Sequence, residues 1–136
     1  MIINSEKFQQ TINNEILFEG VGLHTGINCK LKLKPAAIDY GIVFFIKNKN
    51  KTISIPANID YVNSTIRGTN LLKDDFCIFT VEHLLSALYA LDVNNLKIEI
   101  SSNELPILDG SSKNYVDAIK KIGLKVQNKK SKEFIV

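Results

Sequence analysis

Several features that would each assign a protein to a special class are absent from this sequence. No run of 18 apolar residues occurs, so the chain encodes no membrane-spanning helix. The first residues, MIINSEKFQQ, lack a basic segment followed by an apolar one, and we therefore expect no signal peptide and a cytoplasmic location. The two cysteines, Cys29 and Cys77, have no C-x-x-C spacing, which predicts free thiols on buried strand faces.

What remains is an ordinary globular composition with a slightly basic charge. The 136 residues are 45% hydrophobic and 23% charged, which is typical of one soluble domain with its own core. The 17 basic and 14 acidic side chains leave a net charge of +3. Much of this charge comes from a C-terminal cluster: Lys120, Lys121, Lys125, Lys129, Lys130 and Lys132. A basic cluster also suits an RNA-binding domain, but no aromatic residues alternate with these lysines, so we expect a solvated surface and no nucleic-acid partner.

Short segments with strand periodicity predict a sheet. Residues 28–34 alternate between apolar side chains and Lys30, Lys32 and Lys34, as in a half-buried strand that ends at Pro35. Shorter apolar or alternating runs predict four further strands, at residues 42–46, 52–55, 76–79 and 96–100.

Two segments have helical periodicity. In residues 80–91 the apolar positions form a stripe, Thr80 is placed to cap the helix, and Glu82 suits its positive first turn. Residues 112–122 form a second stripe, with Gly123 placed to end the helix. Together these elements predict an α+β fold, a two-layer sandwich of a mainly antiparallel sheet with two helices on one face.

The end of the second helix divides the chain into two unequal parts. We interpret residues 1–126 as a domain, and residues 127–136 as a linker followed by the start of a missing second domain, because three apolar residues follow a polar stretch. Alternatively, the last residues pair back onto this domain's own sheet. Spacing alone favours neither interpretation.

The first helix carries the residues best suited to chemistry. Glu82 and His83 lie away from the apolar stripe, on a face whose other residues, Ser86, Ala87 and Ala90, are small. Such a face can approach another protein wall closely, although plain exposed surface has the same pattern. A neutral histidine in the first turn can bind a metal, and the adjacent glutamate can take a proton from water. One histidine is weak support, because a catalytic zinc typically has three protein ligands.

Three motifs stand out along the chain: GVGLHTG at residues 20–26, TVEHL at residues 80–84 and PILDGS at residues 106–111. In this order and spacing they resemble the motifs of the UDP-3-O-acyl-N-acetylglucosamine deacetylase family, and the likeness extends over residues 10–123. Residues 64–71 fall where that family has a variable insert beside its active site.

The resemblance implies two similar α+β domains packed face to face, with a zinc site between them. The implied substrate is UDP-3-O-acyl-N-acetylglucosamine, from which the family removes acetate in lipid A biosynthesis. By position, His83 is expected to bind zinc and Glu82 to act as the general base. His24 is expected near the site, where it binds substrate or supports the shape of the site. Asp109 is expected to orient its neighbours, although an aspartate that only fixes a turn explains the pattern equally well.

The same resemblance implies that the other zinc ligands and a second catalytic histidine belong to the second domain. We therefore expect this chain to be inactive alone, to bind zinc poorly, and to need a C-terminal domain in cis or in trans. The face of His83, Ser86, Ala87 and Ala90 is expected to be the interface with that domain and to self-associate without it. The alternative is a non-catalytic binding or interaction module that retained the fold. The presence of both Glu82 and His83 favours the hydrolase.

Overall fold

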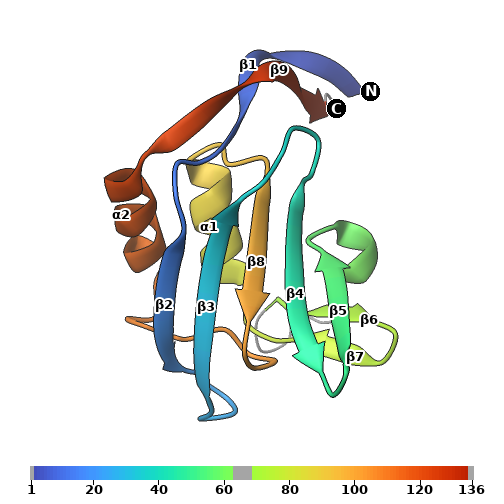
Figure 1. Ribbon diagram of the computed structural model, residues 1–136, viewed down its shortest axis with the longest axis vertical. Coiled ribbons are helices and arrows are strands. Elements are labelled where there is room, and N and C mark those ends of the chain that lie inside the picture. Colours follow the sequence, from blue (N-terminus) through green and yellow to red (C-terminus); the bar gives the residue numbers. More distant parts are fainter. Residues whose placement is uncertain (1, 63–68, 135–136) are drawn as a thin grey trace.

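A computed structural model describes residues 2–62 and 69–134 of the chain (Figure 1). Of the segment expected to be a variable insert, residues 64–68 lie outside this description. The elements in chain order are β1 (Ile2–Ile12), β2 (Ile16–Val21), β3 (Asn28–Pro35), β4 (Ile42–Asn48), β5 (Lys51–Pro56), a 3-10 turn (Ile59–Tyr61), β6 (Leu71–Lys73), β7 (Phe76–Ile78), α1 (Glu82–Ala90), β8 (Leu96–Ile100), α2 (Lys113–Ile122) and β9 (Leu124–Phe134).

The main layer is a five-stranded sheet in the order β2-β3-β8-β4-β5 (Figure 1). Adjacent strands in this sheet pair antiparallel, except β4 and β8, which run parallel. Two small antiparallel ladders, β1-β9 and β6-β7, are the other sheets among the described residues. The predicted α+β fold with a mainly antiparallel sheet is therefore confirmed.

Predicted strands such as β3 have side chains that alternate between the buried core and the opposite face of the sheet. In β3, Cys29, Leu31 and Leu33 are fully buried, while the lysines between them face the other side of the sheet. All five predicted strands are present, as β3, β4, β5, β7 and β8. Both cysteines are free thiols, as predicted, although Cys77 is only half-buried.

Both α-helices cover the same face of the sheet. The ring of Tyr115 in α2 packs edge-on against Phe18 of β2, with 4.9 Å between the ring centres. Phe18 pairs with the buried Leu31 of β3, and Leu84 and Leu88 of α1 join the same core. This shared core confirms the two-layer arrangement. No helix among the described residues is long and apolar enough to cross a membrane.

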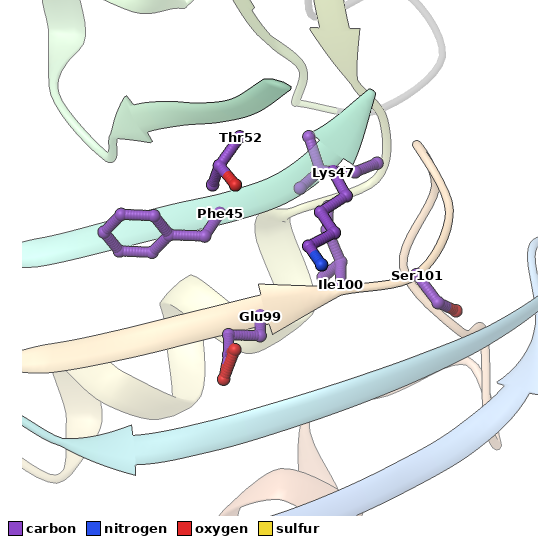
Figure 2. Close-up of a pocket in the computed structure, with 7 residues that line it drawn as sticks. Phe45, Lys47, Thr52, Glu99, Ile100 and Ser101 are labelled. Atoms are coloured by element: carbon purple, nitrogen blue, oxygen red, sulfur yellow. The ribbon is translucent and has the colours of Figure 1, made fainter. Parts of the chain in front are cut away.

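The other face of the sheet is not covered by the helices. It has a pocket of about 420 Å³ at the ends of β4 and β8, where Lys47, Thr52 and Glu99 project from the strands (Figure 2). The Glu99 carboxylate forms an ion pair with Lys34 of β3. This pocket therefore lies on the opposite side of the sheet from α1, which carries Glu82 and His83.

The start of the first helix differs from the prediction. The helix begins at Glu82, its N-cap is Val81, and the cap makes no side-chain hydrogen bond. Thr80 has a φ of 62°, and its hydroxyl donates instead to the carboxylate of Glu104, 2.8 Å away. Thr80 as the N-cap was thus wrong, because a partner distant in sequence takes its hydroxyl. The second helix ends as expected, at Gly123 with a φ of 89°.

The segment expected to be a linker forms a strand in the structure. Residues 127–134 lie in β9, which pairs antiparallel with β1 from the other end of the chain. Their pairing resembles the alternative in which the last residues fold back, except that the partner is β1 and not the main sheet. The existence of a second domain beyond them stays a prediction.

Candidate active site

The three sequence motifs meet beyond the end of the main sheet. The N–H of Ile107 donates to the carbonyl of Val21, at 2.9 Å, so the turn before α2 lies against the end of β2. A Cβ added to Gly20 would lie 3.1 Å from the Cβ of Pro106, which shows how closely these two segments approach. The N–H of Leu105 donates to the carbonyl of Phe79, at 3.3 Å, which joins the same turn to the segment before α1.

Glu82 and His83 occupy the first turn of α1. The Nε2 atom of His83 lies 3.9 Å from Oε1 of Glu82, and each side chain is 32% exposed. The other carboxylate oxygen of Glu82 accepts a hydrogen bond from the N–H of Thr69, at 3.0 Å. One oxygen is therefore held by the backbone, while the second lies beside the imidazole at the surface of the helix.

His24 lies in the tight loop that connects β2 to β3. The loop is closed by hydrogen bonds from Gly22 N–H to the Ile27 carbonyl and from Gly26 N–H to the Gly22 carbonyl, both at 3.0 Å. Gly26 has a φ of 66°, which favours glycine. The backbone N–H of His24 donates to both oxygens of Glu104, at 3.1 and 3.2 Å. The Glu104 carboxylate thus holds the backbone at His24 in place.

Glu104 is a charged residue that sequence reasoning missed. It is 0% exposed, and its carboxylate also accepts hydrogen bonds from the N–H of Thr25, at 2.8 Å, and from the Thr80 hydroxyl. Burial raises the pKa of this carboxyl, but the hydrogen bonds from Thr25, Thr80 and His24 outweigh burial, so the pKa lies below its ordinary value. The one sequence signal was a single carboxylate directly before the apolar Leu105 and Pro106.

The described hydrogen bonds of Asp109 are local and join it to Ser111, two residues further along the chain. Its Oδ1 atom accepts from the N–H of Ser111, at 3.0 Å, and from the Ser111 hydroxyl, at 2.9 Å. These hydrogen bonds lower the pKa of the Asp109 carboxyl below its ordinary value. They fix the turn before α2, as in the structural interpretation of this residue. A role for Asp109 in orienting site residues stays a prediction.

The donor set for a metal is partial. Among residues 2–62 and 69–134, no group of three or more His, Cys, Asp or Glu side chains is arranged to hold a metal ion. His83 offers one imidazole beside a carboxylate, whereas a catalytic zinc typically takes three protein ligands. The described residues therefore fit one ligand position of a zinc site and not a complete set of ligands.

The outward face of α1 differs in one position from the expected interface. Ser86 and Ala90 are exposed and His83 is half-exposed, as expected, but Ala87 is 0% exposed. The buried stripe of the helix thus includes Ala87, which packs into the core and is not part of the exposed surface that carries His83. Tyr89, which the sequence did not predict to be part of this face, is 88% exposed on α1.

Comparison with known proteins places these features in a family. The family model described as UDP-3-O-acyl N-acetylglycosamine deacetylase matches residues 9–136. The UDP-3-O-acyl-N-acetylglucosamine deacetylase of Saccharophagus degradans is 45% identical over 127 residues, which are 93% of this chain and 42% of that protein. The enzyme of the same name from Teredinibacter turnerae is 43% identical over 120 residues, 88% of this chain and 40% of that protein.

A third relative has a further activity in its name. The bifunctional enzyme LpxC/FabZ of Chlorobaculum tepidum is 39% identical over 128 residues, which are 94% of this chain and 27% of that protein. The chain thus spans between 27% and 42% of the length of these curated relatives.

Proposed function

Because the chain belongs to the UDP-3-O-acyl-N-acetylglucosamine deacetylase family, we propose that it is one part of a cytoplasmic, zinc-dependent hydrolase. The proposed reaction removes acetate from UDP-3-O-acyl-N-acetylglucosamine in lipid A biosynthesis. The observation that carries this proposal is the pair of Glu82 and His83 on the first turn of α1, both partly exposed and 3.9 Å apart at their nearest polar atoms. A base next to a metal-binding imidazole suits metal-assisted hydrolysis of an amide.

In the proposed mechanism, Glu82 takes the proton from the water that attacks the acetamide carbonyl. Zinc, when bound with His83 as one ligand, would supply Lewis-acid activation of the carbonyl and the water. The hydrogen bond from Thr69 N–H to one oxygen of Glu82 leaves the second oxygen beside the imidazole, where it can accept that proton. The C–N bond then breaks as the sugar nitrogen takes a proton from the second catalytic histidine, which the second domain would supply, so that acetate and the free amine are released. His24, on the loop of residues 20–26, supports the site or binds substrate.

The rest of the site is proposed to come from a second domain, in cis or in trans. The relatives are more than twice as long as the matched region, which supports this division. The exposed face of α1 with His83, Ser86, Tyr89 and Ala90 is proposed to be the surface that the second domain covers. Alone, the chain is expected to be inactive, to bind zinc weakly and to self-associate through this face.

The test is reconstitution. The chain is joined to the remaining C-terminal part of the Saccharophagus degradans relative, and acetate release from UDP-3-O-acyl-N-acetylglucosamine is measured together with zinc content. We expect activity in the joined protein but not in the isolated chain. Glu82→Ala should lower turnover by roughly 100-fold or more with zinc retained, the scale of a lost general base. His83→Ala should lose zinc.

Glu99→Gln is the matched control, because Glu99 is a partly exposed glutamate on the opposite face of the sheet. It should change neither turnover nor zinc content. A Glu82→Ala enzyme that turns over at the unmutated rate would exclude Glu82 as the base. A joined, folded and zinc-loaded protein that releases no acetate would refute the proposed reaction.

A further inference from the structure

The Glu104 carboxylate joins two segments that lie far apart in the sequence. Its Oε1 atom accepts from the N–H of Thr25, at 2.8 Å, and from the N–H of His24, at 3.1 Å. Its Oε2 atom accepts from the hydroxyl of Thr80, at 2.8 Å, and also lies 3.2 Å from the N–H of His24. One side chain thus holds both the loop of residues 20–26 and the residue from which the chain enters α1.

The backbone under this carboxylate is itself fixed. Phe79 and Glu104 form a parallel bridge, with hydrogen bonds from Phe79 N–H to the Asn103 carbonyl, at 2.8 Å, and from Leu105 N–H to the Phe79 carbonyl, at 3.3 Å. The backbone that carries this carboxylate is therefore held by the segment that leads into α1.

The loop is built around the carboxylate. A Cβ added to Gly22 would lie 2.2 Å from Oε1 of Glu104 and 2.7 Å from its carboxyl carbon. The loop can therefore cover the carboxylate this closely only because residue 22 has no side chain. A buried carboxylate is costly unless it is satisfied by donors, and here the donors come from both segments.

Thr80 is held in a conformation that it would not adopt alone. Its φ of 62° is unfavourable for a β-branched residue. Two side chains hold it there: the Asn70 Oδ1 atom accepts from its N–H, at 3.1 Å, and Glu104 accepts from its hydroxyl. Thr80 is only 3% exposed. Strain of this kind persists only where the surroundings enforce it.

The strained residue directly precedes the proposed catalytic turn. Val81 follows Thr80, and its N–H donates to the carbonyl of Thr69, at 3.0 Å. The N–H of the same Thr69 donates to Glu82, at 3.0 Å. The backbone conformation of Thr80 therefore sets the positions of Glu82 and His83.

We propose that Glu104 is a positioning residue for the proposed deacetylase reaction, which it serves by tying the His24 loop to the strained entry of α1. The inference rests on the proposed function in that Glu82 and His83 are taken as the reacting groups. Glu104 does not touch substrate in this proposal. It acts through Thr80 and through the backbone of His24.

The activity test uses the joined enzyme and the isosteric variant Glu104→Gln, whose amide nitrogen cannot accept from the Thr25 or Thr80 donors. We expect kcat to fall by roughly 10- to 100-fold, because a displacement of about 1 Å at reacting groups can cost on the order of 100-fold. KM should change by less than kcat does, because Glu104 itself does not touch substrate in this proposal. Thr80→Val, which removes only the hydroxyl donor, is the milder second variant and should lower kcat in the same direction.

Two controls separate positioning from simple loss of stability. Glu99→Gln removes a glutamate charge on the other face of the sheet and should leave kcat unchanged. Leu33→Ala removes buried packing from β3 and destabilises the fold, yet should leave kcat unchanged well below its unfolding temperature. If Glu104→Gln and Thr80→Val lower kcat no more than Leu33→Ala does, the positioning role is refuted.

A structural measurement on the 136-residue chain separates this inference from the proposed function. In the NMR spectrum, Glu104→Gln should shift the backbone amide resonances of Val81, Glu82 and His83, and Glu99→Gln should not. Unchanged resonances would overturn the inference whatever the activity. If the unmutated joined enzyme releases no acetate, the proposed function fails, and shifted resonances would still establish the link from Glu104 to the start of α1.

Discussion

Two glycines of one loop are expected to respond differently to the same substitution. Gly22→Ala should be strongly destabilising, because the new Cβ would lie 2.2 Å from Oε1 of Glu104. Gly26→Ala should be mildly destabilising, because a Cβ there meets nothing within 4 Å and only the φ of 66° is unfavourable. The first substitution tests the packing around the carboxylate, and the second tests only the backbone conformation.

The magnitudes follow from the distances. Real Cβ contacts are essentially never shorter than 3.0 Å, so the loop and the carboxylate must separate by about 0.8 Å from the 2.2 Å contact. A shift of this size would lengthen the Thr25 hydrogen bond from 2.8 Å to about 3.6 Å, beyond bonding range. Each hydrogen bond to a charged group contributes about 1.5–3 kcal/mol. The hydrogen bonds from Thr25 N–H and His24 N–H would both be weakened, and the loop would relax in part. We therefore expect the free energy of unfolding to fall by about 2–5 kcal/mol.

Gly26→Ala should cost much less. The left-handed conformation costs a non-glycine residue about 1–2 kcal/mol, and alanine regains about 0.4–1 kcal/mol by restricting the unfolded chain. The expected net loss is therefore about 1 kcal/mol, and Gly26→Asn should cost still less because asparagine tolerates this region.

The assay is urea unfolding of the chain at neutral pH, followed by circular dichroism, with comparable m-values required for all variants. In a Glu104→Ala background, Gly22→Ala should cost clearly less than in the unmutated chain, because the two Glu104 atoms at 2.2 and 2.7 Å are gone and only Thr25 Oγ1, at 2.8 Å, remains close. Equal losses for Gly22→Ala and Gly26→Ala would refute the reasoning. An undiminished loss in the Glu104→Ala background would do so as well.

Two further predictions concern the core and the response to acid. Leu84→Ala in α1 removes a fully buried side chain and should lower the free energy of unfolding by about 2–5 kcal/mol. Leu17→Ala, at a side chain that is 59% exposed on the open sheet face, should change it by less than about 0.5 kcal/mol; similar losses would contradict the assigned core. The depressed pKa of Glu104 means that its ionised form stabilises the fold above the ordinary value of 4.5, and that this contribution is lost as pH falls through the lower folded pKa. The gap in unfolding free energy between the unmutated chain and Glu104→Gln should therefore shrink on acidification, and a constant gap would contradict this.

The parts of the fold that the sequence predicts are those whose state is decided by neighbouring residues. The strand β3 alternates lysines with buried apolar side chains, and α2 has an apolar stripe ended by a glycine, so both could be assigned from local periodicity. The strands β1 and β9 could not. Their pairing joins the two ends of the chain, and the lysine-rich part of β9 has the composition of a solvated linker.

The helix α1 illustrates both outcomes within a few residues. Its apolar stripe was predicted correctly, but the direction of the stripe was taken from the large apolar residues Val81, Leu84, Leu85 and Leu88. The burial of Ala87 turns the covered face toward that residue and leaves Leu85 only partly buried. A small side chain contributes little to an apolar stripe in sequence, whereas in the structure it allows the closest packing.

The supporting residues of the candidate site are harder to predict than its reacting groups, for a physical reason. Glu82 and His83 can be recognised because their chemistry belongs to the side chains themselves, and they are adjacent in sequence. The role of Glu104 exists only through donors from Thr25, His24 and Thr80, which lie 24 to 80 residues away along the chain. Without those donors, the same carboxylate would be an ordinary charged residue. The fold therefore creates this group's function, and a substitution in any one of the three segments should disturb the other two.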